Sequence, residues 1–284
     1  MPRPSPAWFD AQYNARAGIP EHPAILRHWA DASARALARS GWVLDLAYGD
    51  DASERLDILP AAGAAGAPVL VYIHGGYWRA LDKRDQAFVA PPFADAGAMV
   101  AQLNYALCPA VGIEHIAMQL TQALAWVWRH AADHGGDRER IVVAGHSAGG
   151  HLAAMLLACD WQAVAADLPA DLVKSALAIS GLYELEPLRH APFLAADIGL
   201  SAASARRLSP ALWPAPARGR LATVVGGDES EEFRRQSALI ASAWGPVVVA
   251  AETVAGRNHM DVLHEIAHPH SRTHALALEL LGIP

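Results

Sequence analysis

Residues 141–151 read Ile-Val-Val-Ala-Gly-His-Ser-Ala-Gly-Gly-His, and this stretch decides the fold class of the chain. An apolar run enters the segment, glycines stand two residues before and two residues after Ser147, and an apolar helical pattern leaves it. This spacing is typical of a nucleophile elbow, a strained strand-to-helix turn that lifts a serine hydroxyl above a sheet. The helix dipole at such a turn also favours developing negative charge. We therefore predict that Ser147 is a catalytic nucleophile.

A second glycine-rich turn lies upstream, where the apolar run VLVYI leads directly into HGGYW at positions 74–78. Hydrolases with a nucleophile elbow need backbone N–H donors that converge on the oxyanion of the tetrahedral intermediate. One donor comes from the residue after the nucleophile, here Ala148, and the others come from the loop after an earlier strand. We expect Gly75 and Gly76 to supply these other donors, with Tyr77 as a further candidate.

A carboxylate that orients the catalytic histidine is expected after a later strand, because the chain order in such enzymes is nucleophile, acid, histidine. Residues 226–233 read GGDESEEF and offer Asp228 and Glu229 side by side. Only one of two neighbouring side chains can face the histidine. We favour Glu229, because it stands three residues after Gly226 at the usual spacing, and keep Asp228 as the alternative.

The general base is expected in the loop between the last strand and the last helix. The chain contains 14 histidines, so position along the predicted fold decides the choice. Residues 256–259 read GRNH and follow the last strand-like run, which places His259 where the base belongs. His146 and His151 flank the nucleophile and are interpreted as packing or supporting residues. The predicted catalytic triad is therefore Ser147, Glu229 and His259.

Strand-like and helical segments alternate along most of the chain. Strands separated by helices predict the α/β-hydrolase fold, an α/β architecture with a mostly parallel central sheet, helices on both faces and a small cap. We expect a single domain over residues 1–284, with an N-terminal helical segment at 1–40 and a proline-rich insertion at 186–216 as the candidate cap. Strands are predicted at 42–48, 55–59, 69–73, 99–103, 141–144, 175–179, 221–225 and 247–251, and helices at 23–39, 82–96, 114–134, 147–159 and from about 259.

Composition and charge exclude several classes of protein. Hydrophobic residues make up 53 % of the chain, and its formal net charge is −7. An acidic chain without a long basic run is not expected to bind nucleic acid or an anionic membrane surface, and no segment is apolar over the roughly 18 residues that a membrane span needs. The N-terminus lacks the apolar core of a signal peptide, and Cys108 and Cys159 lie in apolar stretches typical of reduced cysteines. We expect a cytoplasmic protein with a small-molecule substrate and without a nucleic-acid or membrane partner; a homodimer is compatible with the sequence.

The segment from His264 to His274, HEIAHPHSRTH, also matches His-Glu-x-x-His, a pattern that binds zinc in metalloproteases. Ser271 stands where metzincins need a glycine with positive φ, and Pro269 disturbs a helix directly after the second histidine. No methionine follows His274, so the Met-turn of metzincins is missing. We therefore expect no metal and no cofactor, and interpret these histidines as polar faces of the last helix.

Together the motifs resemble one family of α/β-hydrolases. HGGYW, LNYALCP, GHSAGGHLAAMLL and GGDESEEFRRQS, followed by GRNHMDVLHE, are similar to the arylformamidase (kynurenine formamidase) group from about residue 48 onward. The resemblance supports Glu229 as the acid, because the family's acid aligns there, although some members carry Asp. It implies hydrolysis of N-formyl-L-kynurenine to L-kynurenine and formate through a formyl-serine intermediate. The aromatic leaving group needs a flat apolar slot, for which Tyr77 and Trp78 are candidates; ordinary core packing is the alternative for both.

Two other functions fit the same pattern. A general carboxylesterase for short acyl or aryl esters would use the same triad, so the triad does not distinguish it from a formamidase. A catalytically silent binding protein with this fold is disfavoured by the complete triad. Esterases related to hormone-sensitive lipase usually carry a third glycine where Tyr77 stands, and this difference favours the formamidase.

Overall fold

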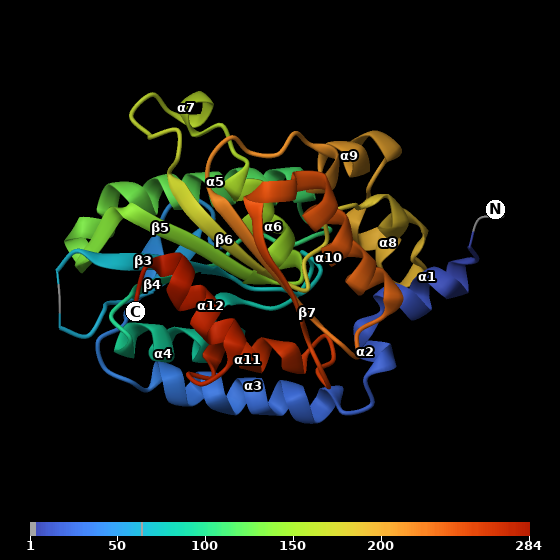
Figure 1. The fold of residues 1–284 in the computed structure, drawn as a ribbon, viewed down its shortest axis with the longest axis horizontal. Coiled ribbons are helices and arrows are strands. Elements are labelled where there is room, and N and C mark those ends of the chain that lie inside the picture. Colours follow the sequence, from blue (N-terminus) through green and yellow to red (C-terminus); the bar gives the residue numbers. More distant parts are fainter. Residues whose placement is uncertain (1–3, 64) are drawn as a thin grey trace.

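An eight-stranded, mostly parallel sheet forms the centre of the molecule, as predicted (Figure 1). The computed structural model describes residues 4–63 and 65–284. The strands follow the order β1-β2-β4-β3-β5-β6-β7-β8; β2 pairs antiparallel with both β1 and β4, and all other pairs are parallel. The strands are β1 (Val43–Ala47), β2 (Arg55–Leu59), β3 (Ala67–Ile73), β4 (Met99–Leu103), β5 (Gly136–His146), β6 (Val173–Ile179), β7 (Arg220–Gly226) and β8 (Val248–Val254).

Helices cover both faces of the sheet, and the central strands are therefore apolar on both sides. In β3, Val69 and Val71 join the core under α5, α6 and α10, whereas Leu70 and Tyr72 join the core under α4 and α12. The α-helices are α1 (Pro6–Tyr13), α2 (Ala15–Gly18), α3 (His22–Leu37), α4 (Ala90–Asp95), α5 (Ile113–His130), α6 (Ala148–Leu157), α7 (Trp161–Val164), α8 (Pro192–Ile198), α9 (Ala202–Arg207), α10 (Glu231–Trp244), α11 (His264–Ala267) and α12 (Arg272–Leu281). Short 3-10 helices lie at Lys83–Val89, Ala131–His134, Glu186–His190, Pro210–Leu212, Gly245–Val247 and Asp261–Leu263.

The final helix differs from the sequence prediction. In place of one helix from about residue 259, the chain forms α11 and then α12. Pro269 lies in the break, and Ser271 caps the new helix by accepting a hydrogen bond from the N–H of His274 at 2.9 Å. The predicted helix 82–96 is likewise divided, into a 3-10 helix and α4.

The two segments outside the alternating core pack together at one end of the sheet. Figure 1 shows α1, in blue, beside α8 and α10, with α2 next to α1, while α3 runs along the face that carries α4 and α11. Residues 186–216, the candidate cap, form short helices that include α8 and α9. The N-terminal helices therefore reach the end of the sheet at which β5 leads into Ser147.

Two observations bear on the predicted surroundings of the protein. Across residues 4–63 and 65–284, no helix combines the length and the apolar character that crossing a membrane requires. Cys108 and Cys159 are both free, and burial raises the pKa of each thiol to about 11. Neither thiol is therefore an activated nucleophile.

Candidate active site

Ser147 lies in a strained turn between β5 and α6. Its φ and ψ are +56° and −116°, in a region that costs a non-glycine residue about 1–3 kcal/mol. The flanking glycines have a steric cause: a Cβ on Gly145 would lie 2.3 Å from the carbonyl oxygen of Gly149, and a Cβ on Gly149 would lie 2.1 Å from that of Ile73. The N–H of Ser147 donates to the carbonyl of Ile179 at 2.7 Å and ties the turn to β6. The turn has the geometry of a nucleophile elbow.

Three buried side chains form a hydrogen-bonded chain that begins at Ser147. Nε2 of His259 lies 3.0 Å from Oγ of Ser147, and Nδ1 of His259 lies 2.6 Å from Oε2 of Glu229. A carboxylate only accepts hydrogen bonds, so the proton of His259 is on Nδ1, and Nε2 accepts the hydrogen bond of the serine hydroxyl. The ring of Phe233 packs against that of His259, with 4.2 Å between centroids. The geometry is that of a nucleophile, its base and the group that orients the base.

The side chain of Glu229 is fully buried, and its carboxylate accepts three hydrogen bonds. Besides His259, the donors are the hydroxyl of Ser180 at 2.5 Å and the N–H of Gly226 at 2.7 Å, both to Oε1. Asp228 is exposed, and no hydrogen bond within the described residues joins its side chain to His259. Of the two acids that the sequence offers, the structure therefore brings Glu229 to the histidine.

Ser180 is a residue of the candidate site that sequence reasoning missed, and its hydroxyl contacts Glu229. It follows β6 directly and has a φ of +51°, and its N–H donates to the carbonyl of Val224 in β7 at 2.7 Å. Because β6 lies between the nucleophile strand β5 and the acid strand β7, a hydroxyl at its end reaches the acid. Ser180 could have been predicted from its position at the carboxyl end of β6, the strand that lies between β5 and β7.

The HGG loop (residues 74–76) runs directly against the elbow. A Cβ on Gly75 would lie 2.8 Å from the carbonyl oxygen of His146 and 3.4 Å from the Cβ of Ser147. Gly76 has a φ of +105°, and a Cβ there would lie 2.1 Å from the carbonyl oxygen of Ala80. Only glycine allows the backbone to approach the serine this closely.

Backbone donors lie unused around Ser147. Among the described residues, the N–H groups of Gly75, Gly76 and Tyr77 have no hydrogen-bond acceptor. Ala148 is the first residue of α6, so its N–H has no partner within the helix. The structure thus brings all four candidate oxyanion donors to the nucleophile end of the sheet.

Tyr77 and Trp78 both have positive φ values, +53° and +58°, and their side chains go to different places. Tyr77 lines the cavity at Ser147, and its hydroxyl donates to the carbonyl of Tyr13 at 2.5 Å. Trp78 is 0 % exposed and packs edge-on against His151, with 5.1 Å between ring centroids. The expectation that Trp78 lines the aryl slot is therefore wrong; it is a core residue. Tyr77 alone of the pair can touch a substrate.

Ser147 opens into a small cavity with a volume of about 80 Å³. The wall combines the HGG loop, the elbow, the base and the N-terminal helices. Its lining residues are Ala15, Arg16, Leu26, Trp29, Gly76, Tyr77, Leu81, His146, Ser147, His259 and Met260. No described residue of the 186–216 insertion lines this cavity. The insertion contacts the cavity wall through Phe193, whose ring packs edge-on against that of Tyr77. The N-terminal segment, for which the sequence predicted only helical structure, forms one wall of the cavity at Ser147.

His146 and His151 support the elbow from within the core. Nε2 of His146 donates to the carbonyl of His259 at 2.8 Å, and Nε2 of His151 donates to the carbonyl of Leu208 at 2.8 Å. Burial lowers the pKa of His146 to about 3 and that of His151 to about 4. Both rings are therefore neutral at neutral pH, and His146 holds the backbone of the base in place.

The histidines of the zinc-like motif are dispersed. His274 is 2 % exposed, and its Nδ1 donates to the carbonyl of Ile266 at 2.8 Å. His264 accepts a hydrogen bond from Nε1 of Trp29 at 2.9 Å, and burial lowers its pKa to about 4. The interpretation of these residues as polar faces of the last helix is wrong for His274, which stacks on Phe93 in the core. Within the described residues, no three histidine, cysteine or acidic side chains are grouped as a metal ion requires.

A serine that is hydrogen-bonded to a histidine, next to free backbone donors, is suited to acyl transfer to water. On this sheet topology, the arrangement is that of a hydrolase with the α/β-hydrolase fold. A kynurenine formamidase from Danio rerio is 27 % identical over 286 residues, which cover 98 % of this chain and 94 % of that protein. The chain thus has the α/β-hydrolase fold and resembles kynurenine formamidases over nearly its whole length.

Other relatives match in part or in fold. A family model described as BD-FAE matches residues 56–167, which include the HGG loop and the elbow. Esterase LipQ from Mycobacterium tuberculosis is 34 % identical over 119 residues, which cover 39 % of this chain and 28 % of that protein. A crystal structure of a protein provisionally described as a thioesterase, from Silicibacter sp. TM1040, superposes with a TM-score of 0.82 and 28 % identity, covering 97 % of this chain and 98 % of that chain.

Proposed function

We propose that this protein hydrolyses an aryl formamide, N-formyl-L-kynurenine, to L-kynurenine and formate. The observation that carries the substrate is the near full-length similarity to a kynurenine formamidase. The cavity supports it, because about 80 Å³ at Ser147 accommodates a formyl group and leaves little room for a longer acyl chain. For comparison, an engineered apolar cavity of about 150 Å³ in another protein binds benzene.

In the proposed mechanism, Nε2 of His259 takes the hydroxyl proton while Oγ of Ser147 attacks the formyl carbon. The buried carboxylate of Glu229 holds the ring and stabilises the imidazolium that forms. His259 then protonates the departing nitrogen, the C–N bond breaks, and formyl-serine remains. Water, deprotonated by His259, attacks this ester; formate leaves, and the proton returns to Ser147.

The negative oxygen of both tetrahedral intermediates needs donors that are in place before reaction. We assign this role to the N–H groups of Gly75, Gly76 and Ala148, with Tyr77 as the alternative from the loop. Removing one such donor typically costs about 10²–10³ in kcat. The support for the assignment is that these donors have no other acceptor among the described residues.

The second candidate function is a carboxylesterase for short acyl esters, favoured by the partial similarity to an esterase. The two are separated by comparing kcat/KM for N-formyl-L-kynurenine and p-nitrophenyl acetate. We expect the formamide to be preferred. A preference for the ester by orders of magnitude would reject the formamidase in favour of the esterase.

Ser147→Ala tests the mechanism for either substrate. We expect kcat to fall by at least about three orders of magnitude, because the hydroxyl of Ser147 is the group hydrogen-bonded to Nε2 of His259. A variant that retained most of the activity would reject Ser147 as the nucleophile. The cytoplasmic location, the homodimer and the cap role of residues 186–216 remain predictions from the sequence.

A further inference from the structure

We propose that Arg16 binds a carboxylate of the leaving group, so that the enzyme selects aryl formamides whose side chain carries a carboxylate over those without one. This inference rests on the proposed function. Arg16 is exposed on α2, yet it lines the same cavity as Ser147. Within the described residues, its guanidinium makes no ion pair and no hydrogen bond to another side chain. An unpaired cation thus stands at the solvent end of a cavity whose reactive atoms are buried.

The charge of Arg16 is not balanced inside this cavity. Of the described residues that line it, none is acidic and Arg16 is the only Lys or Arg. His146 adds no charge at neutral pH, because burial lowers its pKa to about 3. A guanidinium presents paired N–H donors that match the two oxygens of a carboxylate, and such charge-assisted pairs are the stronger kind of hydrogen bond. A carboxylate at the cavity mouth could therefore form paired hydrogen bonds with the guanidinium of Arg16.

The size of the cavity directs the leaving group toward this position. About 80 Å³ cannot enclose an aromatic ring with its substituents. The departing nitrogen must face Nε2 of His259, which protonates it. His259 and Ala15 border both this cavity and a neighbouring one of about 220 Å³. We place the departing aryl group against this shared wall, beside Ala15; Arg16 is the next residue of the chain and lines the same cavity as Ser147.

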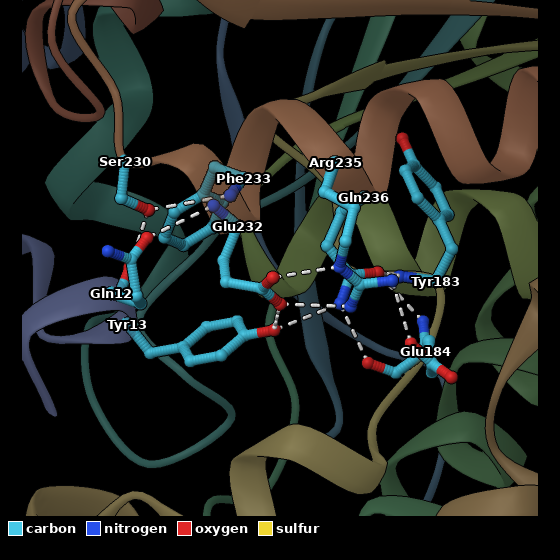
Figure 2. A network of polar contacts seen from close by, with 9 residues as sticks. All are labelled: Gln12, Tyr13, Tyr183, Glu184, Ser230, Glu232, Phe233, Arg235 and Gln236. Carbon is cyan, nitrogen blue, oxygen red and sulfur yellow. Dashed lines mark hydrogen bonds and ion pairs between the residues drawn. The ribbon is translucent and has the colours of Figure 1, made fainter. Parts of the chain in front are cut away.

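The segment that carries Arg16 is held firmly against the helix that follows the acid. Figure 2 shows the end of α1 beside the first turns of α10. The hydroxyl of Tyr13 donates to Glu232 at 2.5 Å. Ser230 donates to the carbonyl of Gln12 at 2.6 Å, and the side-chain oxygen of Gln12 accepts from the N–H of Glu232 at 3.2 Å. The backbone that presents Arg16 is thus placed relative to Glu229, one residue before Ser230.

The other charges of this network are already paired. Arg235 makes two hydrogen bonds of 2.9 Å with Glu232 and an ion pair of 2.9 Å with Glu184 (Figure 2). Gln236 accepts from the N–H groups of Tyr183 and Glu184 at 2.7 and 2.8 Å. Neither Arg235 nor the acids around it are available to a substrate. Recognition of an anion therefore falls to Arg16.

The test measures selectivity between two formamides that differ in the charged side chain. The substrates are N-formyl-L-kynurenine and the neutral N-(2-acetylphenyl)formamide, assayed with wild type, Arg16→Gln and Arg16→Lys. The matched control is Arg206→Gln, which also removes one exposed, unpaired arginine but lies on α9, outside both cavities. We expect Arg16→Gln to lower the ratio of kcat/KM for the two substrates about tenfold, mainly through KM. Arg16→Lys should recover part of the ratio, and Arg206→Gln should leave it unchanged.

The remaining outcomes distinguish a failure of the Arg16 proposal from a failure of the proposed function. An unchanged ratio in Arg16→Gln, or an equal change in Arg206→Gln, would overturn the role of Arg16 while leaving the proposed function intact. If the wild type cleaves neither formamide, the proposed function is wrong. The same variants are then compared on 4-acetoxybenzoate and phenyl acetate, an anionic and a neutral ester. Loss of preference for the anionic ester in Arg16→Gln alone would still support the carboxylate site, and an unchanged preference would reject it.

Discussion

Replacing Glu229 by Gln tests the triad most sharply, because the structure determines how the new amide would be oriented. Oε1 of Glu229 receives the hydroxyl of Ser180 at 2.5 Å and the N–H of Gly226 at 2.7 Å. The N–H of Gly226 can only donate, so the amide oxygen of the glutamine must occupy the Oε1 position. Its NH₂ group is then directed at Nδ1 of His259.

This orientation inverts the tautomer of the base. Facing an NH₂ donor, Nδ1 of His259 must accept, and the ring proton moves to Nε2. Nε2 can then no longer take the proton of Ser147. A wrong tautomer in a catalytic triad lowers kcat about ten-thousandfold, which corresponds to about 5.5 kcal/mol of transition-state stabilisation. We expect a loss of this size in Glu229→Gln.

The matched control is Asp228→Asn, which removes one negative charge from the adjacent, exposed residue. It should change kcat by less than about threefold, because exposed charges are screened by solvent. The assay is N-formyl-L-kynurenine hydrolysis under saturation, with thermal unfolding of each variant to verify that it is folded. A Glu229→Gln enzyme with more than about a tenth of wild-type kcat would refute the reasoning. So would a hundredfold loss in Asp228→Asn, which would make Asp228 the acid.

Two further predictions concern stability. Gly149→Ala should destabilise the fold by about 3 kcal/mol or more, because its Cβ would lie 2.1 Å from a backbone oxygen; Gly150→Ala, where the nearest atom is 3.1 Å away, should cost clearly less in thermal unfolding. Burial lowers the pKa of His151 to about 4, so between pH 6.5 and pH 4 the unfolded chain binds a proton that the folded chain excludes. The free energy of unfolding should therefore decrease as the pH is lowered through this range, by up to about 1.4 kcal/mol per pH unit for this residue. Urea titrations at pH 7, 6 and 5 should show a shallower fall for His151→Gln, which retains a donor for Leu208; an equal slope would contradict the assignment.

The elbow could be placed from the sequence because its geometry admits few residue types. A Cβ at Gly145 or Gly149 would lie 2.3 or 2.1 Å from a backbone oxygen, so only glycine fits at either position. This steric requirement can be recognised from the residue types alone. The sheet was predictable for a related reason. Strands covered on both faces, such as β3, are continuous apolar runs that stand out from the helices between them.

Other parts of the site depend on contacts between distant segments and leave no local pattern. Tyr13 and Glu232 are 219 residues apart, and neither position is unusual by itself. Ser180 reaches Glu229 only because β6 and β7 are neighbours in the sheet. The direction of Trp78 follows from two consecutive residues with positive φ, which ordinary side chains rarely adopt and sequence patterns do not indicate.

The separation of 219 residues between Tyr13 and its partner on α10 also has a consequence during synthesis. Helix α1, which is followed closely by the cavity-lining residues Ala15 and Arg16, is synthesised well before α10, the surface that receives it. Until then Phe9 and Tyr13, both buried in the finished protein, have no partner there. Such non-local docking is slow and leaves apolar side chains open to aggregation in the meantime. The nascent chain therefore docks α1, and the cavity wall that follows it, only after α10 has been synthesised.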